Sequence, residues 1–305
     1  MNADDFGRSD AINQAVIRAH CEGILTSASL MVNEPACAQA ARLAQAHPRL
    51  GVGLHLTLVS GRAALTPQQA PGLVSPEQAF AHDAIRAGLL YFFKHSLREV
   101  LRQEIAAQFA RFAETGLVLD HVNGHLNMHL HPTVLRLLCA PAGAWTIPSV
   151  RLTRDSLWVS ARLARGHWIY RLSHALIFSL LCAWARPRLR RARMRHTRAV
   201  FGLLQNGRVD TEYVSRLLER LPEGDSELYC HPSLTDFRHE LDALVSAQAR
   251  EAVRRSGIQL IRYQDLDHGE TVDHSADRPR LRGHRRRAPQ PGTQTDRSAE
   301  PRHST

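Results

Sequence analysis

Residues 24–32 read ILTSASLMV, and this stretch decides the fold class of the chain. It is apolar or small at almost every position, which is typical of a strand that is buried on both faces. A helical pattern that begins at Ser9 and ends at Gly23 precedes it, and a second one opens at Pro35. This helix–strand–helix order indicates a parallel sheet covered by helices.

The same alternation continues along the chain. Further strands are expected at residues 50–58, 117–125, near 150–152, 227–231 and 258–263, with helices at 97–114, 211–220 and 238–256. We therefore expect a barrel-like α/β fold rather than an open doubly wound sheet. Neither GxGxxG nor GxxxxGK[ST] follows the first strand, so dinucleotide and P-loop sites are not supported.

Composition indicates a globular, cytoplasmic protein. The chain has 305 residues, of which 44% are hydrophobic, enough to bury a sizeable core. Its five cysteines are scattered without a CxxC spacing, which argues against a disulfide framework or a thiolate zinc site. The polar N-terminus gives no sign of a signal peptide.

Positive charge is concentrated in one segment. The net charge is +10, yet residues 151–198 alone hold 12 arginines and one acid, Asp155, so the segment carries +11 and the rest −1. Such a segment suits an anionic surface, and few aromatics interleave with the arginines, so nucleic acid is not expected.

Within this segment, residues 172–185 are apolar but shorter than the ~20 residues needed to span a bilayer. They form either a helix in the membrane interface, with the arginines among the headgroups, or a core helix followed by a solvated basic helix. We expect one domain over residues 1–266 with this basic helical insertion at about 157–198. The polar residues 267–305 are expected to be a disordered tail.

Two adjacent carboxylates, Asp4 and Asp5, stand at the start of the chain. Neighbouring carboxylates repel each other, so a fold keeps them together when a metal or a proton shares the charge, although a solvated acidic turn is the simpler alternative. A strand that ends at these aspartates has little room after Met1. Either the first strand is a stub or the true start lies upstream.

Histidines follow the expected strands. His55 lies near the end of one, and HVNGHLNMHLHP places four more after another, at His121, His125, His129 and His131. Because the carboxyl ends of parallel strands face one crevice, these side chains are expected near the aspartates. One carboxylate and two imidazoles would suit a hydrolytic divalent metal. A core histidine at 55 and a polar loop at 121–131 are the alternatives.

The motifs NADDFG, GILTSASLMV, VGLHLTL, DHVNGHLNMHLHP and LYCHP, in this order, resemble the YdjC-like carbohydrate deacetylases. The arginine-rich insertion is similar to that of the hopanoid-biosynthesis-associated (HpnK) subgroup. The resemblance implies a distorted (β/α) barrel of the polysaccharide-deacetylase type, a divalent metal (Mg²⁺ or Zn²⁺), and removal of an N-acetyl group from an amino sugar. The subgroup implies an N-acetylglucosaminyl hopanoid lipid as substrate, and the basic segment would give peripheral contact with an anionic membrane.

The resemblance also implies roles for individual residues. The metal ligands would be Asp5, His55 and His125. Asp4 would act as the catalytic base, and His231 as the acid or as a group that orients the base. Arg151, His129 and Asn123 would contact the substrate. A surface ion pair is the alternative for Arg151, and Cys230 is interpreted as a buried small residue rather than a nucleophile. Two other functions stay open: deacetylation of soluble chito-oligosaccharides, or an inactive scaffold at the membrane surface.

Overall fold

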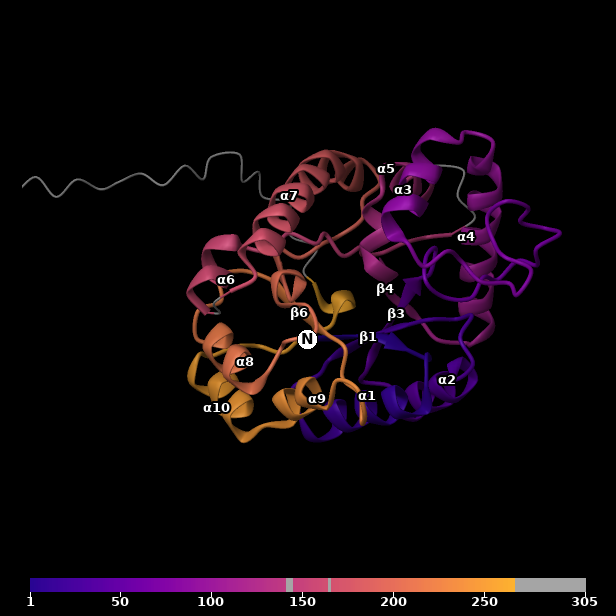
Figure 1. The fold of residues 1–305 in the computed structure, drawn as a ribbon. Coiled ribbons are helices and arrows are strands. Elements are labelled where there is room, and N and C mark those ends of the chain that lie inside the picture. The colour runs from indigo at the N-terminus through magenta and orange to yellow at the C-terminus, as the bar shows by residue number, and fades with distance from the viewer. Residues whose placement is uncertain (141–144, 164–165, 267–305) are drawn as a thin grey trace, which may run out of the picture. The chain divides into compact units, whose positions relative to one another are not determined.

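A six-stranded, fully parallel sheet forms the centre of the computed structural model, which describes residues 1–140, 145–163 and 166–266. The strand order is β4-β3-β2-β1-β6-β5 (Figure 1). The strands are β1 (Asn2–Phe6), β2 (Ser27–Leu30), β3 (Gly51–Leu56), β4 (Leu119–Gly124), β5 (Ala199–Phe201) and β6 (Ser226–Cys230). Every strand after the first is reached through helical segments, which confirms the predicted (β/α) class.

The edge strands β4 and β5 are joined only through an irregular segment. The predicted strand near residues 150–152 is present as two isolated bridges, Val122 to Val150 and Ser149 to Arg195. Further along, the backbone N–H of Val200 in β5 donates to the carbonyl of Arg154. The segment thus partly fills the gap between the two edges, so the barrel is incomplete and distorted.

Helices cover the sheet. They are α1 (Asp10–Glu22), α2 (Cys37–Ala46), α3 (Ala84–Phe93), α4 (Leu97–Glu114), α5 (Pro132–Leu138), α6 (Leu157–Leu163), α7 (Trp168–Arg191), α8 (Thr211–Leu218), α9 (Arg238–Val245) and α10 (Ala247–Arg255), with short 3-10 helices η1 (His125–Leu130), η2 (Leu203–Gln205) and η3 (Tyr263–Asp265). Ser9 caps α1 through its side chain, as predicted. Gly23 ends α1, and a Cβ there would lie 2.4 Å from the Leu244 carbonyl oxygen, so only glycine fits.

Three local predictions are corrected. The predicted helix at residues 238–256 is broken at Ser246, whose side chain caps α10. The predicted strand at residues 258–263 is wrong: the Ile258 N–H donates to the Val253 carbonyl of α10, and the chain then enters η3, where the Gln264 N–H donates to the Asp120 side chain. Helix α3 was not predicted, because its nearly continuous apolar sequence lacks a helical period.

The first strand includes both aspartates and continues to Phe6. Strand β1 pairs with β2 through Asn2, Ala3 and Phe6, and with β6 through Asn2 and Ala3. It has five residues, as many as β6. The strand is therefore not the stub considered as one of two alternatives, and Asp4 and Asp5 lie on a central strand.

The apolar part of the predicted insertion and the first part of its basic stretch, as far as Arg191, form one continuous helix, α7. Its side chains Cys182, Ala185 and Leu189 belong to the hydrophobic core, whereas Leu172 and Leu176 on another face are exposed. Among the described residues, α7 alone is long and apolar enough to cross a membrane, by length and composition. A single helix with one core face and one exposed apolar face differs from one of the two alternatives, a core helix followed by a separate solvated helix.

The described residues up to Leu266 pack as one compact unit, and α6 and α7 lie within the range predicted for the insertion. The predicted tail at residues 267–305 lies outside the described residues.

Candidate functional site

A bulge in β1 turns both aspartates toward His55 of β3. Successive side chains of a regular strand point to opposite faces, but β1 shifts register between Ala3 and Phe6, and Asp5 has a left-handed φ of 63°. As a result, His55 lies 3.9 Å from Asp4 (Nδ1 to Oδ1) and 3.3 Å from Asp5 (Nε2 to Oδ1). A non-glycine residue in this conformation is strained, and such strain is concentrated at functional sites.

Asp5, His55 and His125 converge on one point, as predicted for metal ligands. The Nδ1 atom of His125 lies 3.0 Å from Oδ1 of Asp5 and 3.4 Å from Nε2 of His55, and all three residues are buried. Two ligand atoms that each lie ~2.1 Å from one ion, at angles of ~90–110°, are separated by about 3.0–3.4 Å. The three side chains therefore fit a divalent ion.

The tautomer of His55 supports the same conclusion. Its Nδ1 lies 2.7 Å from the amide oxygen of Asn123, so Nδ1 carries the proton and donates it there. The lone pair of Nε2 then faces the Asp5 carboxylate oxygen at 3.3 Å. Two acceptors that face each other in a buried site require a cation or a proton between them.

The Asn123 side chain orients His55 and Asp4 through hydrogen bonds. It lies on β4 and is fully buried, and its amide nitrogen donates to Asp4 Oδ1 at 3.1 Å and to the Ser29 hydroxyl at 2.8 Å. Because its amide oxygen also accepts a hydrogen bond from His55, the Asn123 side chain makes all of its hydrogen bonds within the protein. It holds His55 and Asp4 in register with each other.

Ser29, His121 and Asp120 form a line of buried hydrogen bonds behind Asn123. Ser29 Oγ lies 2.9 Å from His121 Nε2, and His121 Nδ1 lies 2.9 Å from Asp120. The order resembles a nucleophilic triad, but Ser29 is fully buried and its oxygen already accepts from the amides of Asn2 and Asn123. This array fixes the amides rather than attacking a substrate.

Arg151 forms a buried ion pair with Asp4. Its two terminal nitrogens lie 2.7 Å and 2.8 Å from the Asp4 oxygens, and its other edge binds Glu227. Burial acts to raise the pKa of the Asp4 carboxyl, but the Arg151 guanidinium outweighs it and the pKa lies well below its usual range. Asp4 is therefore ionised at neutral pH, and the surface ion pair considered for Arg151 is a buried one.

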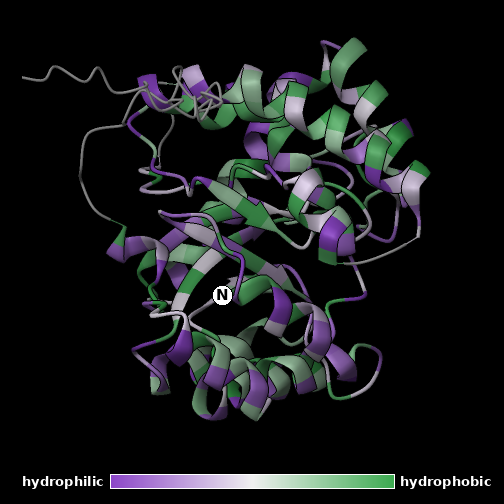
Figure 2. Cartoon of the chain, turned by 90° about the vertical axis from the view of Figure 1, so that its left-hand side faces the viewer, coloured by the Kyte–Doolittle hydropathy of each residue, from purple (hydrophilic) through white to green (hydrophobic). Residues whose placement is uncertain are grey.

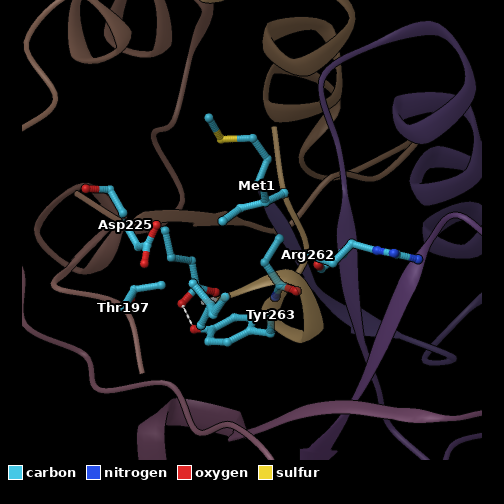
Figure 3. A pocket seen from close by; sticks show the side chains of 11 residues that line it. Met1, Thr197, Asp225, Arg262 and Tyr263 are labelled. Carbon is cyan, nitrogen blue, oxygen red and sulfur yellow. Dashed lines mark hydrogen bonds between the residues drawn. The ribbon is translucent and has the colours of Figure 1, made fainter. Parts of the chain in front are cut away.

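Glu227 continues this network to the opposite end of the sheet. It accepts a hydrogen bond from the Tyr263 hydroxyl beside a pocket at the amino ends of β1 and β6 (Figure 3). Met1, Thr197, Asp225, Arg262 and Tyr263 are among the residues that line this pocket. Because it lies at the amino ends of the strands, it is separate from the cluster around His55. The role of Glu227 was not predicted, although an acidic residue in the expected buried strand 227–231 indicates that a buried cation pairs with it.

His231 follows β6 and lies at the accessible side of the cluster. Its side chain is 21% exposed, more than those of Asp4, Asp5, His55 or His125. Its backbone N–H donates to Glu240, a buried carboxylate of α9 that lies 3.9 Å from its Nδ1. His231 is close enough for its charge to lower the pKa of Asp4. Glu240 was not predicted from its sequence pattern.

The remaining predicted residues are buried. His129 Nε2 donates to the Arg151 carbonyl at 2.9 Å, and burial lowers the pKa of His129 to about 3, so it is neutral. Cys230 is buried and its thiol pKa is raised well above the usual range by burial, as fits a packing residue.

The segment after His125 has an unusual backbone. Leu126 and Asn127 both adopt left-handed conformations, with φ of 50° and 58°. The side chain of Asn127 accepts a hydrogen bond from the Thr153 hydroxyl at 2.7 Å, which ties this turn to the irregular segment between the edge strands. The turn leaves Leu126 half-exposed directly beside a predicted metal ligand.

Comparison with known proteins identifies relatives over most of the chain. A model of the YdjC-like protein family matches residues 1–255. A carbohydrate deacetylase of Geobacillus stearothermophilus is 30% identical over 279 residues, which cover 87% of this chain and 96% of that protein. A protein of the same name from Mus musculus is 29% identical over 309 residues, and the match covers 88% of this chain and 94% of that protein.

Other matches are more local or concern the fold. A carbohydrate deacetylase of Brevibacillus brevis is 38% identical over 148 residues, but this alignment spans only 56% of that relative's length. The crystal structure of a protein from Enterococcus faecalis V583, described as a cellobiose-phosphate cleavage protein, superposes with a TM-score of 0.65 at 25% identity. The superposition covers 86% of this chain and 96% of the chain from Enterococcus faecalis.

Proposed function

The chain belongs to the YdjC-like protein family, and from that premise we propose that it is a metal-dependent hydrolase that removes an N-acetyl group from an amino sugar. The observation that carries the proposal is the convergence of Asp5, His55 and His125 beside the ionised Asp4. Relatives named carbohydrate deacetylase support the substrate class.

In this proposal Asp5, His55 and His125 hold a divalent ion. When bound, it would polarise the acetyl carbonyl and make a water molecule more acidic. The donor set of two imidazoles and one carboxylate is compatible with Zn²⁺, and Mg²⁺ is the other candidate. Asn123 fixes the tautomer of His55 that leaves Nε2 available as a ligand.

Asp4 and His231 move protons. Asp4 accepts the proton of the attacking water on a carboxylate oxygen, and Arg151 keeps that carboxylate ionised and in place. His231, at the accessible side and backed by Glu240, donates a proton to the nitrogen of the leaving amine, because an amide nitrogen leaves poorly without one. Asn123 and His129, predicted as substrate contacts, act here as positioning residues, since both are fully buried.

At a finer level, we propose that the amino sugar is carried by a lipid and that the substrate is an N-acetylglucosaminyl hopanoid. The exposed apolar face of α7 and the resemblance of the arginine-rich insertion to the hopanoid subgroup support this. All five cysteines are free thiols, which suits a reducing compartment, and we place the enzyme at the cytoplasmic face of the membrane. Soluble chito-oligosaccharides are the second candidate, because the names of the relatives mention carbohydrate without a lipid.

Acetate release tests the function directly. The purified full chain, supplied with Zn²⁺ or Mg²⁺, is assayed on a soluble N-acetylated chito-oligosaccharide and on an N-acetylglucosaminyl lipid in vesicles. We expect acetate from the lipid with the higher kcat/KM. A preference for the soluble sugar would favour the second candidate, and the absence of acetate from both would leave the inactive scaffold.

A further inference from the structure

Helices α3 and α7 both expose apolar faces that no part of the described chain covers. The exposed large apolar side chains are Ile85, Leu89, Leu90, Phe92 and Phe93 on α3, and Trp168, Ile169, Leu172, Leu176, Ile177 and Leu180 on α7. On α7 the positions 169, 172, 176 and 180 are three or four residues apart, so they share one face of the helix. We refer to these two sets together as the apolar rim.

The apolar rim adjoins the candidate active site. Helices α3 and α7 both pack against α5, and both α5 and α7 contact η1, the segment that carries His125. Phe92 of α3 contacts the ring of His131, which caps the start of α5. The half-exposed Leu126 lies in the same region, directly after His125.

The views agree with this placement. Figure 1 shows α3, α5 and α7 along the upper edge of the folded unit, and Figure 2 shows hydrophobic ribbon on the helices of that edge. Two helices that are far apart in sequence thus expose apolar residues on the same side.

Cationic side chains flank the apolar rim. Arg190 and Arg191 are exposed at the end of α7, and Arg193 is exposed just after it. Arg86 is exposed on α3 and Lys94 just after it, while the exposed Asp83 caps the start of α3. Residues 156–198 contain no acid. Apolar side chains bordered by cations complement a bilayer that carries anionic headgroups.

A second copy of the chain is a poorer occupant for the same surface. A two-fold contact through α7 would bury its apolar face but would leave its arginines without an acid of the same segment to pair with, because residues 156–198 contain none. Trp158 on α6 and Trp168 on α7 are exposed, and tryptophan favours the interface between bilayer and water.

We propose that the apolar rim docks the protein on an anionic bilayer, with α3 and α7 both in the interface, so that the site beside His125 faces the membrane. The docking itself does not depend on the proposed function; only the statement that the site beside His125 is catalytic rests on it. An amino sugar whose lipid anchor stays in the bilayer could then reach the site without leaving the membrane.

Vesicle co-sedimentation of the full chain tests the docking. Vesicles of phosphatidylcholine alone are compared with vesicles of equal parts phosphatidylcholine and phosphatidylglycerol, both without a sugar substrate. We expect binding to the anionic vesicles that weakens as salt rises. The double variants Ile169→Gln/Leu176→Gln on α7 and Ile85→Gln/Phe93→Gln on α3 should each weaken binding at least about tenfold.

The controls are matched to these changes. Val118→Gln replaces a side chain that is 79% exposed at the start of β4, far in sequence from either helix, and should bind like the wild type. Arg190→Gln/Arg191→Gln should weaken binding to anionic vesicles, by about fivefold per arginine, and leave binding to neutral ones unchanged. Melting curves show whether each variant is folded.

Several results would overturn the inference. These are wild-type protein that stays in the supernatant at low salt, an α3 variant that binds as tightly as the wild type, and equal binding to neutral and anionic vesicles. A dimer in solution that the rim substitutions dissociate would show that a second copy covers the surface instead.

Activity separates this inference from the proposed function. If both hold, the rim variants lose acetate release from a lipid-borne amino sugar but keep it from a soluble one. A wild type that binds vesicles yet releases acetate from neither substrate would contradict the proposed function and leave the docking intact.

Discussion

Replacing Asp5 with asparagine is expected to remove the bound divalent ion and reduce acetate release to background. Asp5 supplies the only carboxylate of the three-residue cluster, and an amide is a much weaker ligand. Asp4→Asn should instead keep the ion and lower kcat by about 10²–10⁴, because it removes only the proposed general base. Metal content and kcat are measured on the same preparations.

The comparison has an internal control in Asp10→Asn. Asp10 is an exposed carboxylate in the first turn of α1, and its replacement should change neither metal content nor kcat appreciably. If Asp4→Asn and Asp5→Asn lost the ion equally, the division of roles between the two aspartates would be wrong.

Replacing Arg151 with methionine is expected to destabilise the fold by about 3–5 kcal/mol, because the change leaves two buried carboxylates, Asp4 and Glu227, without their cation. Methionine fills much of the same space without a charge. The free energy of unfolding, from denaturant titration, measures the effect.

A second substitution distinguishes lost charge pairing from lost packing. Adding Glu227→Gln to Arg151→Met removes one of the uncompensated charges and should recover part of the stability. Arg102→Met, which breaks the exposed pair with Glu99 on α4, should change stability little. A double variant no more stable than the single one would show that the Arg151–Glu227 pairing contributes little.

The pattern of residues predicts that the aspartate pair, His55 and the histidines of residues 121–131 meet, because this follows from a general property of parallel sheets. The choice of Asp5 and His125 within these groups came from the resemblance to the YdjC-like family. Asp5, His55 and His125 lie on or directly after strands β1, β3 and β4, and their carboxyl ends meet at one place. What the pattern of residues could not supply is the bulge at Asp5, since its left-handed backbone is set by packing and not by residue type.

Residues that act behind this cluster were harder to predict. Glu227 and Glu240 serve Arg151 and His231 through contacts that depend on how distant strands and helices align. Asn123 looked available for a substrate and is instead enclosed by His55, Asp4 and Ser29. Burial decided its contacts, and burial of a polar residue is not visible in the sequence.

Helix α3 and residues 258–263 show the same limit for the fold. A run such as residues 84–93 is apolar on all sides, and its period therefore does not distinguish helix from strand. Residues 258–263 have a strand-like composition, but the Ile258 N–H bonds to the end of α10 and the Gln264 N–H just after them bonds to Asp120, so neighbouring groups set the outcome.

Metal removal and return tests the central claim most directly. The wild-type enzyme is freed of metal with a chelator, metal analysis confirms the removal, and acetate release from an N-acetylated amino sugar is followed while Zn²⁺ or Mg²⁺ is added back. We expect no acetate from the metal-free enzyme and full recovery at about one ion per chain, with no recovery for Asp5→Asn. Undiminished acetate release by an enzyme shown to be free of metal would contradict the account.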